Sequence, residues 1–344
     1  MKSKRSIAAD VVGALGLARG LGVLRSALVK DLRVLAYHRV LPSVDEESFA
    51  FDVELVSARQ EEFDWQMAHI ARHFQPVSCQ QVVDAIERRA PLPKRAVMVT
   101  FDDGFRDNYE IAFPLLRRHG VPALFFLSTG YIDTDRVFWF DWLVHAILRT
   151  SAREIRLEAL GLTIEPGHTV AARRGQALKL MSTLKRMPEA RRLEVLAQLD
   201  LAAAVEPSAA DIAQSGAMTW DQVREMAVAG MEFGSHTVSH PILSTVTESA
   251  QLCFELEASK ATIEREAGRP VLALAYPVGG RDAVDERVLG AVERAAYKLA
   301  FTYQSGVNAL ASGERLLLKR LHVERYTSRH MFAATLELPE VFAP

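Results

Sequence analysis

The sequence predicts an α/β fold, organised as one barrel-like domain with a helical insertion. Short apolar runs bounded by polar or turn residues recur along the chain, with helical stretches between them. Because buried parallel strands are apolar runs joined by crossover helices, this alternation indicates a mostly parallel sheet. A chain of 344 residues, 49% of them apolar, is long enough for one large core. The predicted strands are 34–37, 97–101, 123–127, 231–233, 272–276, 299–302 and 316–321.

Three helices are predicted between the first strands. Residues 60–74 and 79–88 show helical apolar spacing, and 108–119 form a helix that Gly120 ends, with Pro122 just before the next strand. Each helix stands between two predicted strands. The order therefore supports crossover connections of the βαβ type.

The region from about 131 to 217 breaks this rhythm. It is rich in Ala, Leu, Arg and Glu and contains no convincing strand, so we expect a helical insertion. Its opening, residues 138–142, reads FWFDW. Aromatic side chains at a barrel mouth can stack on a bound ring, but the usual burial of Trp and Phe favours a role in anchoring the insertion.

Composition excludes several classes of protein. Acidic and basic residues nearly cancel, leaving a formal charge of −2, so no nucleic-acid partner is expected. The two cysteines, Cys79 and Cys253, form no CxxC pair. A disulfide framework is therefore not expected to hold the fold together.

Residues 1–30 are treated separately from the predicted catalytic domain, residues 31–344. Three basic residues precede an apolar stretch over 7–29, but Asp10, Arg19 and Arg25 interrupt it. Neither a cleavable signal peptide nor a membrane span is expected, because a span needs about 20 apolar residues. We expect a cytoplasmic protein.

The same segment has the pattern of a basic amphipathic helix. Apolar residues recur at helical spacing, namely Val11, Leu15, Ala18, Leu21, Leu24 and Leu28. Such a helix either lies on a membrane surface, here the inner membrane, or packs on the barrel. Periodicity alone does not separate these two alternatives.

Two neighbouring carboxylates follow the predicted strand 97–101. Asp102 and Asp103 stand in the sequence TFDDG, at the carboxyl end of a strand, where α/β barrels build their active sites. A plain turn would also use Asp and Gly. As a functional pair, the two carboxylates would repel each other unless a cation lay beside them. A metal ion would bind one carboxylate as a ligand and keep the other ionised.

Two histidines follow a second strand end. His236 and His240, in GSHTVSHP, are spaced i and i+4 and can converge on one ion across a helical turn or tight loop. With a carboxylate from the first motif they form a ligand set that leaves coordination positions open. The combination favours catalysis over a structural turn.

The chain resembles the polysaccharide deacetylases, also called the NodB-homology or carbohydrate esterase family 4 group. The resemblance lies in residues 100–104 (TFDDG), 236–240 (HTVSH) and 275–279 (AYPVG), in that order, within a core from about 97 to 321. In motif style the chain is most similar to the branch that acts on exopolysaccharides of biofilms.

The resemblance implies a fold, a reaction and a set of residues. The fold would be a distorted (β/α) barrel with fewer than eight repeats, of the NodB or glycoside hydrolase/deacetylase type. Asp103, His236 and His240 would bind a divalent metal, and Asp102 would be the general base in hydrolysis of N-acetyl groups on amino sugars. Zn is the expected ion, and Fe, Ni, Co or Mn also suit these ligands.

Two histidines compete for the role of general acid. His38, in LAYHRV, ends the first predicted strand and resembles the acidic histidine of the biofilm branch. His322, in KRLHV, ends the last strand, where more typical members place theirs. We favour His38, although a lone histidine at a strand end is often only a packing residue.

One departure from the family pattern concerns the third motif. Ala275 stands where many members have an arginine that orients the base, so Arg320 or Arg39 would have to substitute from a neighbouring strand. Tyr276 and Pro277 complete this motif, and the backbone N–H of Tyr276 or a neighbour could donate to the oxyanion. Tyr303 and Asn308, in the segment 301–308, are further candidates for contact with substrate.

The expected function is hydrolysis of N-acetyl groups on an exopolysaccharide, cell-envelope glycan or lipid-linked saccharide. The same site could instead open a non-sugar amide or an O-acetyl ester, because hydrolytic machinery does not specify the acyl carrier. A catalytically silent glycan-binding protein is a third alternative. The joint presence of Asp102, His236 and His240 speaks against it, since binding alone needs no general base.

Overall fold

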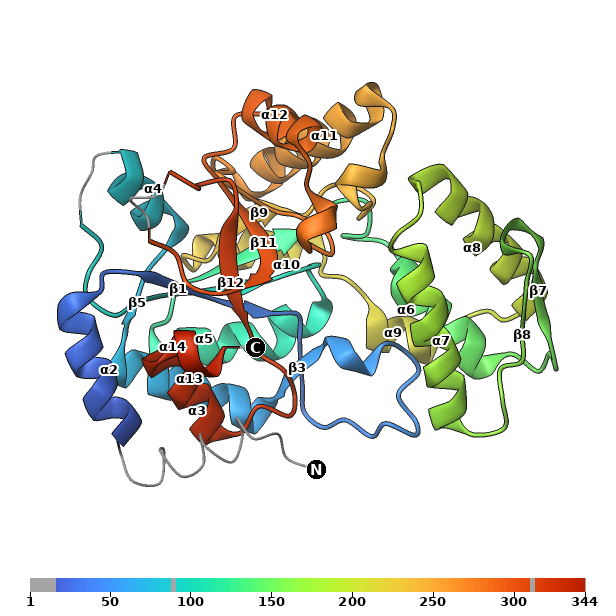
Figure 1. Ribbon diagram of the computed structural model, residues 1–344, viewed down its shortest axis with the longest axis horizontal. Coiled ribbons are helices and arrows are strands. Elements are labelled where there is room, and N and C mark those ends of the chain that lie inside the picture. The colour runs from blue at the N-terminus through green and yellow to red at the C-terminus, as the bar shows by residue number, and fades with distance from the viewer. Residues whose placement is uncertain (1–16, 88–90, 310–312, 344) are drawn as a thin grey trace.

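A computed structural model describes residues 17–87, 91–309 and 313–343. At its centre seven parallel strands close into a barrel that helices surround (Figure 1). This confirms the predicted distorted barrel with fewer than eight repeats. The barrel strands are β1 (Leu32–Tyr37), β5 (Ala96–Phe101), β6 (Ala123–Leu127), β9 (Glu232–Ser235), β10 (Ala273–Ala275), β11 (Leu299–Ser305) and β12 (Leu318–His322).

The barrel closes through β1. This strand pairs with β5 along its whole length and with β12 on its other side, where Leu35 lies opposite Leu321. A two-residue strand, β4 (Gln75–Pro76), adds to the start of β5. Because the barrel strands are parallel, their carboxyl ends share one rim, and the motifs that follow β5 and β9 meet there.

Several helical segments outside the insertion pack around the barrel. They are α3 (Gln60–His73), α4 (Cys79–Glu87), η2 (Asn108–Ala112), α5 (Phe113–His119), α10 (Trp220–Val228), α11 (Ser249–Ala267), α12 (Glu286–Arg294), α13 (Arg329–Glu337) and α14 (Pro339–Phe342). The predicted third helix begins as a π-helical turn, η2, and ends at Gly120 in the left-handed conformation, φ 64°. Glycine reaches this conformation without a Cβ clash.

The insertion lies between β6 and α10 and forms a lobe beside the barrel, on the right of Figure 1. It contains α6 (Trp139–Arg149), α7 (Val170–Leu184), α8 (Glu189–Ala203) and α9 (Ala209–Ser215). The expectation that it lacks strands is wrong. An antiparallel hairpin, β7 (Ile155–Leu157) and β8 (Leu162–Ile164), lies between α6 and α7, and three-residue strands are too short for alternation to reveal.

The aromatic opening of the insertion anchors it to the barrel. Phe138 is buried and stacks on Tyr131, with ring centroids 4.0 Å apart, and it also contacts Phe105. Phe140 packs against His240 at 5.1 Å between centroids. These contacts fix the insertion next to the rim that carries the histidine pair.

The helix α2 (Leu17–Leu28) packs against α13 through its small residues, while the N-terminal part of the predicted amphipathic helix lies outside the described residues. Ala18, Gly22 and Ser26 are buried, and a Cβ at Gly22 would overlap the carboxylate of Glu337. Leu21, Leu24 and Leu28 point away, with 50%, 66% and 86% of their surface exposed. The helix therefore packs on the barrel domain and still presents a row of leucines to solvent.

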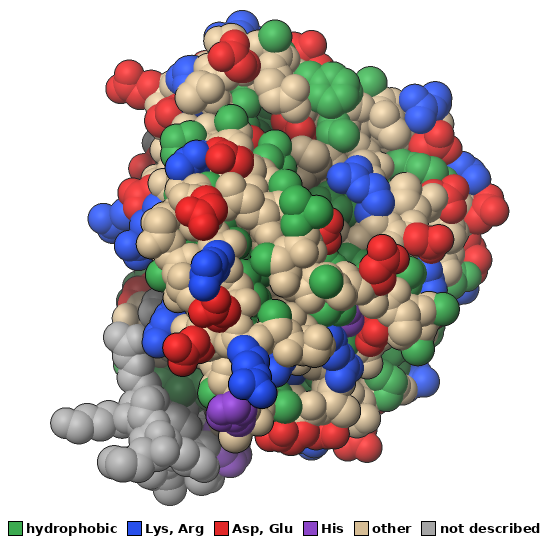
Figure 2. All heavy atoms as spheres, turned by 90° about the vertical axis from the view of Figure 1, so that its right-hand side faces the viewer, with side chains coloured by type: hydrophobic (Ala, Val, Ile, Leu, Met, Phe, Trp, Pro, Cys, Tyr) green, Lys and Arg blue, Asp and Glu red, His purple; other side chains and the backbone are tan. Residues whose placement is uncertain are grey.

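The surface over the insertion is mixed in charge. On the face turned to the viewer in Figure 2, acidic and basic side chains are interspersed. Among helices in the described ranges, none is long and apolar enough to cross a bilayer.

Candidate active site

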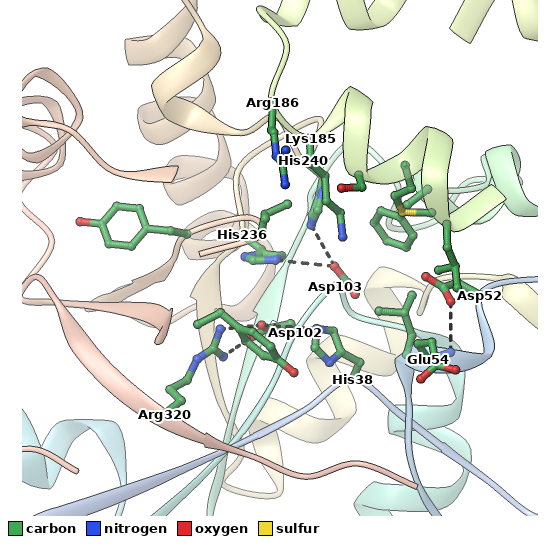
Figure 3. Close-up of a pocket in the computed structure, with 18 residues that line it drawn as sticks. His38, Asp52, Glu54, Asp102, Asp103, Lys185, Arg186, His236, His240 and Arg320 are labelled. Atoms are coloured by element: carbon green, nitrogen blue, oxygen red, sulfur yellow. Dashed lines mark hydrogen bonds and ion pairs between the residues drawn. The ribbon is translucent and has the colours of Figure 1, made fainter. Parts of the chain in front are cut away.

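A pocket of about 500 Å³ opens at the carboxyl-terminal rim of the barrel. The ends of β1, β5, β9, β10, β11 and β12 contribute to it, and α7 of the insertion forms its opposite wall (Figure 3). Every predicted metal ligand lines it, together with Asp102, His38, Tyr276 and Arg320. Side chains far apart in sequence are therefore brought into one cavity.

Asp103, His236 and His240 form a compact buried cluster. Asp103 Oδ1 lies 3.6 Å from His236 Nε2 and 3.3 Å from His240 Nε2. One ligand atom from each residue lies within 4.8 Å of the others, a separation that a single ion can bridge.

A carboxylate behind the histidine loop holds its shape. Glu255 on α11 accepts hydrogen bonds from the backbone N–H of Val238, at 2.8 Å, and of Ser239, at 2.9 Å. Its other oxygen accepts from the Ser239 hydroxyl at 2.7 Å. This cap lets the loop reverse within four residues, so that His240 faces His236.

Hydrogen bonding sets the tautomer of His236. Its Nδ1 lies 2.8 Å from the carbonyl oxygen of Ala275, an acceptor, so Nδ1 carries the proton and Nε2 presents a lone pair to Asp103 and the cavity. Histidine ligands of metals are commonly oriented in this way. The third motif thus orients His236, one of the three candidate metal ligands, through its backbone carbonyl at Ala275.

Burial keeps both histidines in the form that a metal requires. It lowers the pKa of His236, and it lowers the pKa of His240 to about 3 with a further contribution from Arg192. Asp103 Oδ1 is buried and has no hydrogen-bond donor among the described residues. An acceptor without a donor beside two neutral imidazoles fits a divalent cation.

Asp102 lies in a different environment from its neighbour. Both oxygens accept hydrogen bonds from Arg320, Nη1 to Oδ1 and Nη2 to Oδ2, each 2.7 Å long. Burial alone would raise the pKa of Asp102, but the Arg320 guanidinium holds it well below its usual range, whereas burial raises the pKa of Asp103. Asp102 is therefore kept ionised by Arg320, apart from the cluster of Asp103, His236 and His240.

Of the two arginines considered as substitutes for the missing one, Arg320 contacts Asp102. It is fully buried, and its Nε also donates to the Thr302 carbonyl at 2.8 Å. Arg39 instead pairs with Asp107, Nε to Oδ2 at 2.9 Å, outside the pocket.

His38 and His322 differ in their access to the pocket. His38 lines it, with Nε2 3.8 Å from Asp102 Oδ2. The His322 ring stacks on Tyr303 at 3.8 Å between centroids and does not line the cavity. Burial lowers the pKa of His38, and burial with Arg320 lowers that of His322 to about 4.

The backbone N–H of Tyr276 is already engaged. It donates to the Phe301 carbonyl at 3.0 Å, and the phenol donates to the Leu316 carbonyl at 3.0 Å. Pro277 is buried and has no N–H. An oxyanion donor from this motif would come from the next residue, Val278, which lines the pocket with φ 63°.

Backbone strain is concentrated at this rim. Eight described residues other than glycine have positive φ. Three of them, Asp103, His240 and Val278, line the cavity, and a fourth, Thr237, directly follows His236. Such conformations cost of order 1–3 kcal/mol each and persist where the surroundings impose them, often at active sites.

Several pocket residues were not predicted from the sequence. They are Asp52, Glu54, Met181, Lys185 and Arg186. The segment 52–54 and the end of α7 carry no recognisable motif, so only the folded chain reveals them. Tyr303, a predicted candidate, lines the pocket, whereas Asn308 binds backbone groups of Leu32 and Lys319 away from it.

Comparison with known proteins connects this geometry to a family. The profile of the family described as polysaccharide deacetylase matches residues 89–173 and 181–300. The poly-beta-1,6-N-acetyl-D-glucosamine N-deacetylase of Escherichia coli K12 is 37% identical over 78 residues, 23% of this chain. The chain spans only 11% of that relative's length.

Solved structures agree in fold. The Streptococcus pyogenes deacetylase PplD, in complex with acetate, is similar at a TM-score of 0.58 and 20% identity, over 91% of this chain and 99% of that one. IcaB from Ammonifex degensii is similar at a TM-score of 0.56 and 19% identity, over 90% of this chain and 96% of that one. With the family profile covering more than half of the residues, the chain belongs to the polysaccharide deacetylase family.

Proposed function

We propose that the protein is a metal-dependent hydrolase that removes N-acetyl groups from amino sugars of an exopolysaccharide or cell-envelope glycan. The observation that carries this proposal is the pairing of two carboxylates with different tasks. Asp103 faces two neutral histidines, while Asp102 is held ionised beside them by Arg320. The E. coli relative named for N-deacetylation of a glucosamine polymer supports the choice of substrate class.

The residues divide the reaction between them. Asp103, His236 and His240 would hold a divalent cation, which polarises the amide carbonyl and makes the attacking water more acidic. Asp102 is placed to accept the proton of that water, and Arg320 keeps its carboxylate oriented. The neutral nitrogen and carboxylate ligands suit Zn, and metal analysis of the purified protein identifies the ion.

The leaving amine needs a proton, and His38 is the residue whose position suits this task. It borders the cavity beside Asp102, whereas Tyr303 covers the His322 ring. We expect His38→Ala to lower kcat by about 100-fold or more, the usual size of general-acid catalysis, and His322→Ala by less than about tenfold. Steady-state kinetics on one substrate checks both, and the reverse order of effects would assign the acid to His322.

Acetate release tests the proposal directly. The purified protein is incubated with a panel of N-acetylated and O-acetylated oligosaccharides, with and without chelator. Chelator-sensitive release from the N-acetylated members supports the proposal. Faster release from the O-acetylated members would make the protein an esterase, and a tightly bound glycan with no release would make it a binding protein.

We also propose that α2 contacts an anionic membrane surface. The support is the exposed row of Leu21, Leu24 and Leu28 next to Arg19 and Lys30, a combination typical of helices that lie in the membrane interface. The triple change of these leucines to serine should abolish co-sedimentation with anionic vesicles. The matched control replaces Leu193 and Leu201, which are exposed on α8. Equal vesicle binding by the wild-type protein, the triple variant and the control variant would refute the membrane contact.

The place of α2 also bears on the substrate. Three residues separate the end of α2 from the start of β1, at the end of the barrel opposite the pocket. The six-residue strand β1 then rises about 20 Å toward the pocket. A membrane touching α2 would thus lie far from the pocket mouth. As a substrate, this arrangement favours a glycan chain that reaches out from the membrane. It is less suited to a sugar linked directly to a lipid.

A further inference from the structure

The insertion brings two cations to the wall of the pocket that faces the metal-ligand cluster. Lys185 and Arg186 directly follow α7, and Figure 3 shows both side chains across the cavity from Asp102 and Arg320. Both are exposed. Within the described ranges, neither side chain forms a hydrogen bond or an ion pair, so their donors are available to a ligand.

This lack of partners contrasts with the other arginines near the site. Arg320 is paired with Asp102, Arg39 with Asp107 and Arg192 with Glu189. These three side chains are buried, where a charge without a partner would be costly. Lys185 and Arg186 avoid that cost because they face the open cavity rather than the protein interior.

The two cations are held on a rigid support. Leu180, Met181 and Leu184 bury one side of α7. Arg174, on the same helix, donates to the carbonyl oxygen of Phe51, at 2.8 Å, which ties α7 to the segment that carries Asp52. The end of α7 is therefore fixed relative to the barrel rim, as a preorganised binding group requires.

Charge balance indicates what the cations can bind. The pocket is lined by four carboxylates, Asp52, Glu54, Asp102 and Asp103, and by three cations, Lys185, Arg186 and Arg320. If all seven side chains are ionised, the net charge of the pocket is −1. A bound divalent cation would change this net charge to +1. Burial raises the pKa of Asp52 and lowers the pKa of Lys185, so these two shifts move the balance in opposite directions.

A neutral acetamido sugar offers these two cations hydrogen-bond acceptors without a charge, whereas an anion offers charge-assisted hydrogen bonds, which are stronger. Arg binds planar carboxylate or phosphate oxygens through a fork of N–H groups, and Lys adds a compact charge. An already deacetylated sugar, which carries an ammonium, would be repelled by the same wall.

We propose that Lys185 and Arg186 form an anion subsite and that the substrate is an acidic saccharide, with a carboxylate or phosphate group near the N-acetylated sugar. This inference rests on the proposed deacetylase function and narrows it to a substrate class. The insertion thereby becomes the element that selects the substrate, while the barrel carries the reaction.

The test compares matched N-acetylated oligosaccharides that are neutral, carry a uronate, or carry a phosphodiester. In the Lys185→Met/Arg186→Met double variant, kcat/KM for the acidic substrates should fall by about 10- to 100-fold more than for the neutral one, as expected for lost hydrogen bonds to a charged group. The acidic substrate, uronate or phosphodiester, whose kcat/KM falls more in the double variant identifies the anion. Lys179→Met, an exposed lysine of α7 outside the pocket, is the control and should change neither value.

Equilibrium binding of the same oligosaccharides gives a second readout that does not depend on turnover. The wild-type protein should bind the acidic forms at least about tenfold more tightly than the neutral form, and the double variant should lose this preference. A wild type that does not discriminate, or a double variant that loses both substrates equally, would overturn the anion subsite and leave the deacetylase intact. Preferential binding of acidic sugars without acetate release would overturn the proposed reaction instead.

Discussion

Asp102→Asn should lower kcat by about 10³-fold while the bound metal is retained, because the amide has the size of the carboxylate but cannot accept a proton from water. The structure separates Asp102 from the proposed ligand set, because both of its oxygens accept hydrogen bonds from Arg320 whereas Asp103 faces the two histidines. The measurement is acetate release under saturating substrate, beside metal content. Full activity of the variant would exclude Asp102 as the base.

A matched control is needed because Arg320 is buried and would lose its charged partner. Breaking a buried ion pair costs about 3–5 kcal/mol, so Asp102→Asn should also lower the melting temperature. Asp107→Asn breaks the comparable buried pair with Arg39, outside the pocket. Asp107→Asn should destabilise the fold similarly while the folded enzyme keeps its turnover. A loss of turnover seen only in Asp102→Asn would therefore report on the chemistry and not on stability.

His236→Ala and His240→Ala should each abolish detectable activity and reduce bound metal from about one equivalent per chain to near zero. The physical reason is that only three protein residues would hold the ion, so the loss of one leaves two ligands, too few to retain it. Elemental analysis after dialysis checks occupancy, and acetate release checks activity. His119→Ala, which removes a histidine paired with Asp64 at 2.8 Å outside the pocket, is the control. A variant of His236 or His240 that keeps a full equivalent of metal would place the ion elsewhere.

The pH dependence of metal binding follows from the same environment. A metal competes with protons for the histidine nitrogens, and burial lowers the pKa of His240 to about 3 and also lowers that of His236. Lowered values mean that both rings stay neutral as the pH falls below 6.5, the usual histidine value. The wild-type protein should therefore retain its metal down to about pH 5, in contrast to a site built from exposed histidines.

Much of the site could be predicted because its residues stand directly after strands. Asp102 and Asp103 follow β5 and His236 follows β9, and the runs predicted as strands at 97–101 and 231–233 overlap these two strands. Parallel strands place their carboxyl ends on one rim, so strand-end residues converge whatever their separation in sequence. The hairpin of the insertion was not predictable by the same reasoning, because its strands are only three residues long.

The sequence by itself determined the parallel barrel, the motifs at its rim and the family, because apolar periodicity and strand-end motifs are local properties of the chain. Tertiary structure alone decided that Arg320 rather than Arg39 holds Asp102, since the two differ only in which interior atoms they reach across the closed barrel. It likewise decided that Lys185 and Arg186 line the same pocket as Asp103, His236 and His240. Their place depends on how a separate helical lobe packs on the rim, a long-range contact that no local pattern encodes.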